Sequence, residues 1–339
     1  MTQTSIRKIV AAVLALAALL AVGQFAGLLG PTASAQSAIA AKTVDGALPV
    51  TDPAADAWSE AALVQIALSG QLVTAPTRPT PFVPSLGVRV LVNDTHAAFL
   101  LRWDDPTKDN RTTKDREFRD AAAILFGPAG PAPSVCMGGP GQQLQVAQWK
   151  ADWQADLEEG FRDLEHAYPN FWVDYYPYAV GGPPYHLPDA FPETARVYLP
   201  GWYVGNPFSD PLKVTAVEEA NAQGFGTLAT QAQQDALGRG VHSGAGWSVV
   251  VSRPLAPSDP EDVAITSGVV LAFALWDGTS GDVGARKSVS SWFVLELPET
   301  GAAPASFLLW LLPIVLAVVL VFVIAARRRR RRKPSPGEE

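Results

Sequence analysis

Residues 88–103 read VRVLVNDTHAAFLLRW, and this stretch indicates the fold class. Two apolar runs, 88–92 and 97–103, flank the turn-forming pair Asn93-Asp94, which predicts a strand, a tight turn and a second strand. Further short apolar runs at 121–126, 247–252, 269–276 and 290–297 are separated by turn-forming residues. Several short strands with regular turn signals favour an all-β domain, a β-sandwich or barrel, over residues 58–298.

The middle of this domain has a different composition. Residues 160–210 combine many aromatic residues with Pro and Gly, which predicts a long ordered insertion packed by its own aromatic side chains. Long loops of this kind are often functional, although an aromatic minicore beneath a lid is an equally good interpretation. The segment from Ala151 to His166 is the one plausible helix.

The N-terminus has the features of an export signal. Arg7 and Lys8 precede an apolar run, and the small residues Ala33-Ser34-Ala35 follow it. That order predicts a secretory signal peptide over 1–35, cleaved before Gln36. The small, polar residues 36–57 then predict a linker. Because the signal has no twin-arginine pair, we expect export of an unfolded chain that acquires any cofactor afterwards.

The C-terminus predicts a membrane anchor. Residues 307–326 form a run of mostly apolar residues about as long as the ~20 needed to cross a bilayer. Six arginines and Lys333 follow at once, and such a basic segment stays cytoplasmic. We therefore expect a linker over 299–306, a transmembrane helix over 307–326, a basic cytoplasmic tail over 327–339, and a single-pass membrane protein whose ectodomain is extracytoplasmic.

A second interpretation of this end remains open. Leu297-Pro298-Glu299-Thr300-Gly301, followed by an apolar span and a basic tail, resembles the sorting signal of sortase-anchored surface proteins. Cleavage after Thr300 would join the ectodomain to the cell wall and discard the helix. The ectodomain lies outside the cell in both cases.

Charge and cysteine content exclude several classes of function. The whole chain carries a formal charge of −7, but its basic residues are concentrated in the signal and the tail. The segment 36–300 keeps 17 basic and 31 acidic residues, so nucleic acid and anionic lipid are poor partners for it. Cys136 is the one cysteine, which rules out an internal disulfide and a Cys-x-x-Cys-His motif for covalent haem.

Few motifs point to catalysis. The four histidines are scattered without metal-ligand spacing, and the pairs Asp104-Asp105 and Glu158-Glu159 are typical of solvated surface. Met137 is the only methionine left after signal removal. A thioether is a soft ligand suited to haem iron, although a lone methionine more often fills a gap in a core.

A resemblance gives Met137 a role. From about Asp120 onward the chain resembles the haem-b-binding gamma subunits of the ethylbenzene dehydrogenase and dimethylsulfide dehydrogenase group, which serve molybdenum enzymes of the dimethyl sulfoxide reductase family. The likeness is carried by short blocks in the expected order: 119–126, 136–138, 149–153, 205–207, 218–219, 224–228, 247–255, 273–278 and 286–292. It implies a β-sandwich that holds haem b non-covalently between a methionine and a lysine.

The resemblance also assigns candidate ligands to the haem iron. Met137 matches the methionine, and Lys287, in the Arg-Lys-Ser-Val-Ser block, is the favoured lysine, with Lys213 as the alternative. A lysine ligates only as the neutral amine, so its pKa must be lowered by burial. Without the resemblance, Lys287 would be interpreted as an exposed lysine paired with Asp277 or Asp282.

The resemblance implies an electron-transfer subunit without substrate chemistry of its own. Its partners would be a molybdenum catalytic subunit and an iron–sulfur subunit, or another redox carrier. The membrane anchor and the aromatic insertion depart from the family pattern and put the usual partner arrangement in question. A haem-free carbohydrate-binding module and a structural cell-surface protein are the alternatives.

Overall fold

The computed structural model describes residues 37–134, 137–162, 164–168, 170–171, 178, 181, 190–257 and 259–298. Contacts divide the chain into two units, Met1–Leu297 and Pro298–Glu339, and the described strands and helices all belong to the first. The predicted signal 1–35, linker 299–306, transmembrane helix 307–326 and tail 327–339 lie outside the described residues. Within the described part of the chain, no helix has both the length and the apolar character that a membrane span requires.

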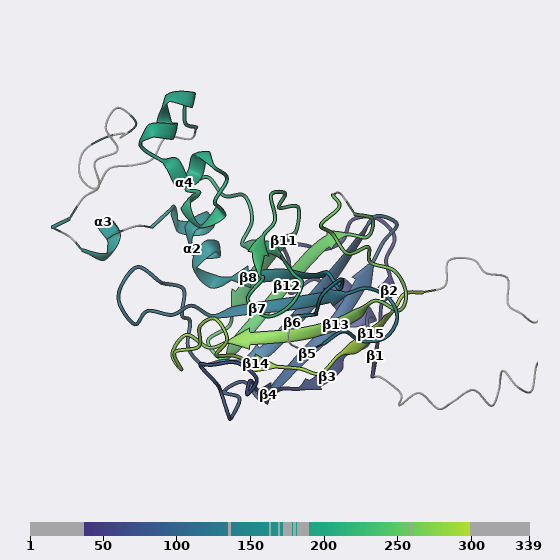
Figure 1. Ribbon diagram of the computed structural model, residues 1–339. Helices are drawn as coiled ribbons and strands as arrows, with labels where there is room; N and C mark the ends of the chain where they lie inside the picture. Colours follow the sequence, from purple (N-terminus) through teal and green to yellow (C-terminus); the bar gives the residue numbers. More distant parts are fainter. Residues whose placement is uncertain are drawn as a thin grey trace, which may run out of the picture. The chain divides into compact units, whose positions relative to one another are not determined.

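Among the described residues, two sheets account for most of the first unit (Figure 1). The small sheet has the order β11-β12-β6-β5-β2, with β3 paired to β5. Its strands are β2 (Lys42–Thr43), β3 (Val64–Ala67), β5 (Ser85–Val92), β6 (His96–Asp104), β11 (Leu237–His242) and β12 (Gly246–Pro254). The predicted hairpin is confirmed: β5 and β6 pair antiparallel, and the Asn93 side chain accepts hydrogen bonds from the backbone of Thr95 and His96.

The large sheet has the order β1-β15-β13-β7-β8-β9-β10, with β14 paired to β13 and β4. Its strands are β1 (Ala38–Ala40), β4 (Ser69–Gly70), β7 (Ala121–Gly127), β8 (Leu144–Lys150), β9 (Val217–Ala222), β10 (Ala229–Thr230), β13 (Val270–Trp276), β14 (Ser288–Val289) and β15 (Phe293–Glu296). The central strands β13, β7, β8 and β9 run antiparallel to their neighbours. Their order pairs residues that are distant in the chain, such as Ala121 and Trp276.

The inner faces of the two sheets form a common core, which confirms the predicted sandwich. Phe99 of β6 packs against Phe126 of β7 at 5.6 Å between ring centroids. Trp149 of β8 meets Trp103 at 6.4 Å and Trp247 at 4.9 Å, both from the small sheet. These rings are nearly or fully buried, and burying each aromatic side chain stabilises the fold by about 1.5–3 kcal/mol.

The N-terminal segment differs from the expected linker. Within residues 36–57, β1 pairs parallel to β15 and β2 pairs parallel to β5. Residues from Leu48 to Ala61 then cover the outer face of the small sheet, where Trp58 in the 3-10 helix η1 (Asp56–Glu60) is 2% exposed. A small, polar composition suggests a linker, but small side chains also allow a strand to add to a sheet edge.

Apart from η1, the helical segments of the described residues lie between β8 and β9. They are α2 (Ala151–Glu159), α3 (Leu164–Ala167), η3 (Glu193–Val197), α4 (Pro200–Tyr203) and η4 (Pro207–Ser209). The helix expected over 151–166 ends at Gly160, whose φ of +90° is outside the helical range. Much of the predicted aromatic insertion, including 172–177 and 182–189, lies outside the described residues.

Candidate functional site

The outer face of the large sheet carries an apolar surface built from small residues. Strand alternation directs Ile124, Phe126 and Phe273 into the sandwich and their sequence neighbours outward. The outward set, called here the alanine-rich face, consists of Ala121, Ala123, Val146, Ala220 and Trp276, with Leu125, Met137 and Ala274 packed on it. Half of these eight side chains are single methyl groups, and the five residues of the cluster itself are buried.

A cavity of about 380 Å³ borders the alanine-rich face. Ala121 and Trp276 belong to both, and Gln148 and Arg119 also line the cavity. Arg119 pairs with Asp152 at 2.5 Å between Nη1 and Oδ2, and the carboxylates Glu117 and Asp282 also line the cavity. The lining therefore combines apolar side chains with charged groups of both signs.

Met137 lies on the alanine-rich face with its side chain half-buried. Its backbone has a φ of +67°, in the left-handed region that residues other than glycine rarely adopt. Such conformations persist where surrounding structure enforces them, often at functional sites. The turn around Met137 is closed by a hydrogen bond from Gly138 N to Ser134 O at 3.0 Å; its neighbours Val135 and Cys136 lie outside the described residues.

Lys287 reaches the same face from the segment between β13 and β14. It immediately precedes β14, where Ser288 lies opposite Leu275 and is buried toward the core, so alternation directs Lys287 outward beside Trp276. Its Nζ lies 4.9 Å from the centroid of the Trp276 ring. Met137 and Lys287 therefore contact one shared cluster of side chains.

The amine of Lys287 has no hydrogen-bonding or ionic partner among the described residues. Burial alone lowers the pKa of Lys287 to about 8, well below that of an exposed lysine. The acidic residues that could have paired with it are engaged elsewhere: Asp282 binds Arg78, and Asp277 accepts from Ser280. A thioether and an unpaired amine are the donor set that the resemblance implies for haem iron.

Lys213 is placed differently. Its Nζ lies 3.0 Å from Asp156 Oδ2 and donates to the carbonyl of Asp210 at 2.8 Å. The ammonium also lies 4.9 Å from the Phe161 ring and is nearly buried. The structure thus commits Lys213 to an ion pair beside α2, whereas it leaves Lys287 unpaired on the alanine-rich face.

Lys150 is a further buried lysine on this sheet, and no sequence motif marks it. It ends β8 on the outward side, forms a buried ion pair with Glu218, and lies 4.0 Å from the Trp153 ring and 4.1 Å from the Phe208 ring. Burial lowers the pKa of Lys150 to about 8, and Glu218 partly opposes the shift. The alternation of Gln148 and Lys150 with Ala147 and Trp149 is the sequence pattern that indicates a strand with Lys150 on its outward face.

The described histidines do not assemble into a site. His96 is exposed beside Thr95, His166 is exposed on α3, and His242 shares a hydrogen bond of 2.9 Å with the carbonyl of Asp105. His186 lies outside the described residues.

Comparisons with known proteins point to one group. The sequence profile of the ethylbenzene dehydrogenase family matches residues 55–172. A protein of Haloferax mediterranei named as a respiratory nitrate reductase heme subunit is 22% identical over 76% of this chain and 72% of its own length. The dimethylsulfide dehydrogenase subunit gamma of Rhodovulum sulfidophilum is 27% identical over 69% of this chain and 72% of its own length.

Solved structures give a more distant likeness. A family 9 carbohydrate-binding module from Caldicellulosiruptor kristjanssonii, in complex with glucose, covers 78% of this chain and 100% of its own, at 9% identity and a TM-score of 0.33. A likeness of that size bears on neither fold nor function. The sequence comparisons thus show that the chain is similar to the ethylbenzene dehydrogenase family over residues 55–172 and, over most of its length, to a heme subunit and to a dimethylsulfide dehydrogenase subunit gamma.

Proposed function

We propose that this chain is a non-catalytic electron-transfer subunit that holds one haem b against the alanine-rich face, with Met137 and Lys287 as the axial ligands. The observation that carries the proposal is that a half-buried thioether and an unpaired amine contact the same apolar cluster. The names of the sequence relatives, a heme subunit and a gamma subunit, support it independently. A haem held non-covalently supplies one-electron redox chemistry, while the protein sets its ligation and potential.

Met137, Lys287 and the alanine-rich face would each have a different role in such a haem site. The soft thioether of Met137 favours the reduced iron, and the low pKa of Lys287 makes the neutral amine available. The methyl groups of the alanine-rich face would exclude water from the macrocycle.

We place this subunit outside the cytoplasm, tethered by the helix 307–326 or joined to the cell wall through Leu297–Gly301. It would exchange electrons with a molybdenum catalytic subunit and an iron–sulfur subunit, or with another redox carrier. The export signal, the spanning run and the acidic ectodomain support this placement. The assembly of the dimethylsulfide dehydrogenase relative from subunits, implied by its name, supports a partnered role.

The two candidate lysines can be separated by matched substitutions. We expect Lys287→Gln to weaken haem binding by at least about 100-fold, since changes in mere supporting groups already cost 10–100-fold at metal sites. Lys213→Gln should bind haem like the wild type, because its ammonium is held by Asp156. Haem titration of both purified full-length variants in detergent measures the difference. The reverse ranking would transfer the ligand role to Lys213.

Haem binding should also depend on pH through Lys287. Below its pKa of about 8, a proton must leave the amine before it can ligate, so affinity should fall by up to about tenfold for each unit of decreasing pH. Above that pKa the amine is already neutral and the dependence should level off. Haem titrations between pH 6.5 and 9.5 test this, and the slope should disappear in Lys287→Gln. An unchanged slope in that variant would assign the titration to another group.

A further inference from the structure

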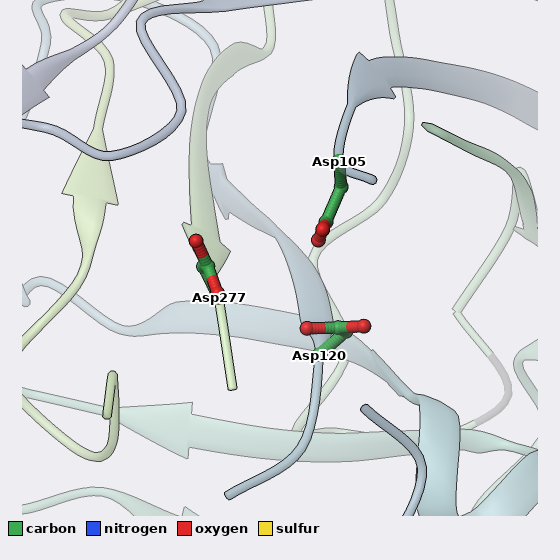
Figure 2. A group of neighbouring side chains, drawn as sticks. All are labelled: Asp105, Asp120 and Asp277. Atoms are coloured by element: carbon green, nitrogen blue, oxygen red, sulfur yellow. The ribbon is translucent and has the colours of Figure 1, made fainter. Parts of the chain in front are cut away.

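Three aspartates from both sheets meet at one end of the sandwich. Asp105 directly follows β6 of the small sheet, Asp120 directly precedes β7 of the large sheet, and Asp277 directly follows β13. Figure 2 shows their carboxylates turned toward a common space. One ligand oxygen from each lies within 4.8 Å of the others. The sequence predicts Asp104-Asp105 as solvated surface, and this is wrong for Asp105, which is 3% exposed.

The cluster lacks a compensating positive charge. Asp120 is fully buried and accepts hydrogen bonds from Asp109 N at 2.8 Å, Gly278 N at 2.9 Å and Trp247 Nε1 at 3.0 Å, all of them neutral donors. None of the ion pairs between described residues includes any of the three aspartates. Burial raises the pKa of Asp120 to about 7. Burial also raises the pKa of Asp105, and the negative charge of Asp277 raises it further.

Asp105 supplies an independent indication of a missing ligand. Its Oδ1 accepts from the backbone and the hydroxyl of Thr107, at 3.0 and 2.8 Å. Its Oδ2 is buried and has no hydrogen-bond partner among the described residues. In Figure 2 this carboxylate points toward Asp120 and Asp277. A buried acceptor left unsatisfied costs about 1–3 kcal/mol, and more when it is charged, so a ligand is expected at this position.

We propose that Asp105, Asp120 and Asp277 bind one divalent cation, and that Ca²⁺ is the ion they fit best. The donors are all oxygens, which Ca²⁺ and Mg²⁺ prefer to the softer transition metals. Two oxygens bound to one Ca²⁺ at about 2.3–2.6 Å can lie up to about 5 Å apart, whereas Mg²⁺ requires about 2.0–2.1 Å and a stricter octahedron. The spacing within 4.8 Å suits the larger ion.

A cation at this position would cross-link two segments of the chain. It would join the segment between β6 and β7 to the segment between β13 and β14, and the second of these carries Lys287. These segments already touch closely: a Cβ added at Gly278 would lie 2.2 Å from the carbonyl oxygen of Phe118, and Thr279 donates to Asp109. The cation would thus lock the two sheets together at the end that borders the cavity. This inference stands without the haem proposal, because its readout is stability in Ca²⁺.

The test uses the purified full-length chain in detergent, stripped with EDTA and dialysed into metal-free buffer. We expect Ca²⁺ at roughly 1–10 mM to raise Tm by about 5 °C or more, with one site per chain by calorimetry and a weaker effect of Mg²⁺. Asp105→Asn should abolish the rise and make the metal-free protein more stable than the wild type, because it removes one of three buried like charges. The exposed Asp115→Asn is the matched control and should keep the full rise.

Two results would overturn this inference. One is a wild-type Tm that Ca²⁺ leaves unchanged after EDTA treatment, which would mean that protons neutralise the cluster. The other is a rise in Asp105→Asn equal to that of the wild type, which would place the bound ion elsewhere. If Asp105→Asn does not fold, Asp277→Asn, at a half-buried position, provides the same comparison.

Discussion

Met137→Ala should abolish the low-spin b-type spectrum of the haem-loaded protein and weaken haem binding by at least about 100-fold. Its thioether is a proposed axial ligand, and loss of a ligand should cost more than the 10–100-fold typical of supporting groups. Any haem retained should have a lower reduction potential, because a thioether ligand raises it. Absorption spectra of the reduced protein and a redox titration measure both effects.

Two further variants separate ligation from folding. Met137→Gly removes the same sulfur but suits the backbone φ of +67°, so it should lose haem binding without loss of stability. Val146→Ala, on the same face, removes apolar contact but no ligand, and should bind haem within about tenfold of the wild type. A wild-type reduced spectrum in Met137→Ala and Met137→Gly would exclude Met137 as a ligand.

Glu218→Gln should lower the free energy of unfolding by about 3 kcal/mol at pH 6. The substitution leaves the buried ammonium of Lys150 without its partner, and breaking a buried pair from one side typically costs about 3–5 kcal/mol. Because the pKa of Lys150 is already lowered to about 8, the amine becomes neutral at higher pH and the loss should be smaller at pH 9. Chemical denaturation at both pH values measures it.

An exposed pair provides the control for Glu218→Gln. Lys42 and Glu60 lie 3.8 Å apart with side chains that are 49% and 61% exposed. Glu60→Gln should therefore change stability by less than about 1 kcal/mol. Equal losses in Glu60→Gln and Glu218→Gln would show that the Lys150–Glu218 contact is solvated and contributes little.

The strands that can be predicted from the sequence are those whose buried residues form a continuous apolar run. The hairpin 88–103 and the strands β7, β12 and β13 are apolar runs bounded by turn residues. Strand β8 (LQVAQWK) was missed because buried Gln145 interrupts its pattern; Gln145 donates to Glu219 and Asp262. Strand β9 (VEEANA) has two glutamates, and Glu219 is buried because the backbone N–H groups of Asp235 and Ala236 bind it. A local sequence pattern cannot predict these hydrogen bonds, because the bonded residues are distant in the chain.

The residues of the candidate site follow from the family resemblance and not from a local apolar pattern. Only the resemblance points to Met137 and Lys287, since nothing in their spacing connects residues so far apart. Their common surface exists because β13 lies next to β7, a strand order set by the whole fold. The burial of Asp105 was equally inaccessible, because it depends on contacts with the segments around Ala245 and Asp277.

The most direct test is the absorption spectrum of the purified full-length chain after haem is added, recorded oxidised and after reduction. We predict one haem per chain and a low-spin b-type spectrum when reduced. The spectrum should be lost in the double variant Met137→Ala/Lys287→Gln and kept in Lys213→Gln. A wild-type chain that binds no haem, or one whose spectrum survives the double variant unchanged, would contradict the proposed function.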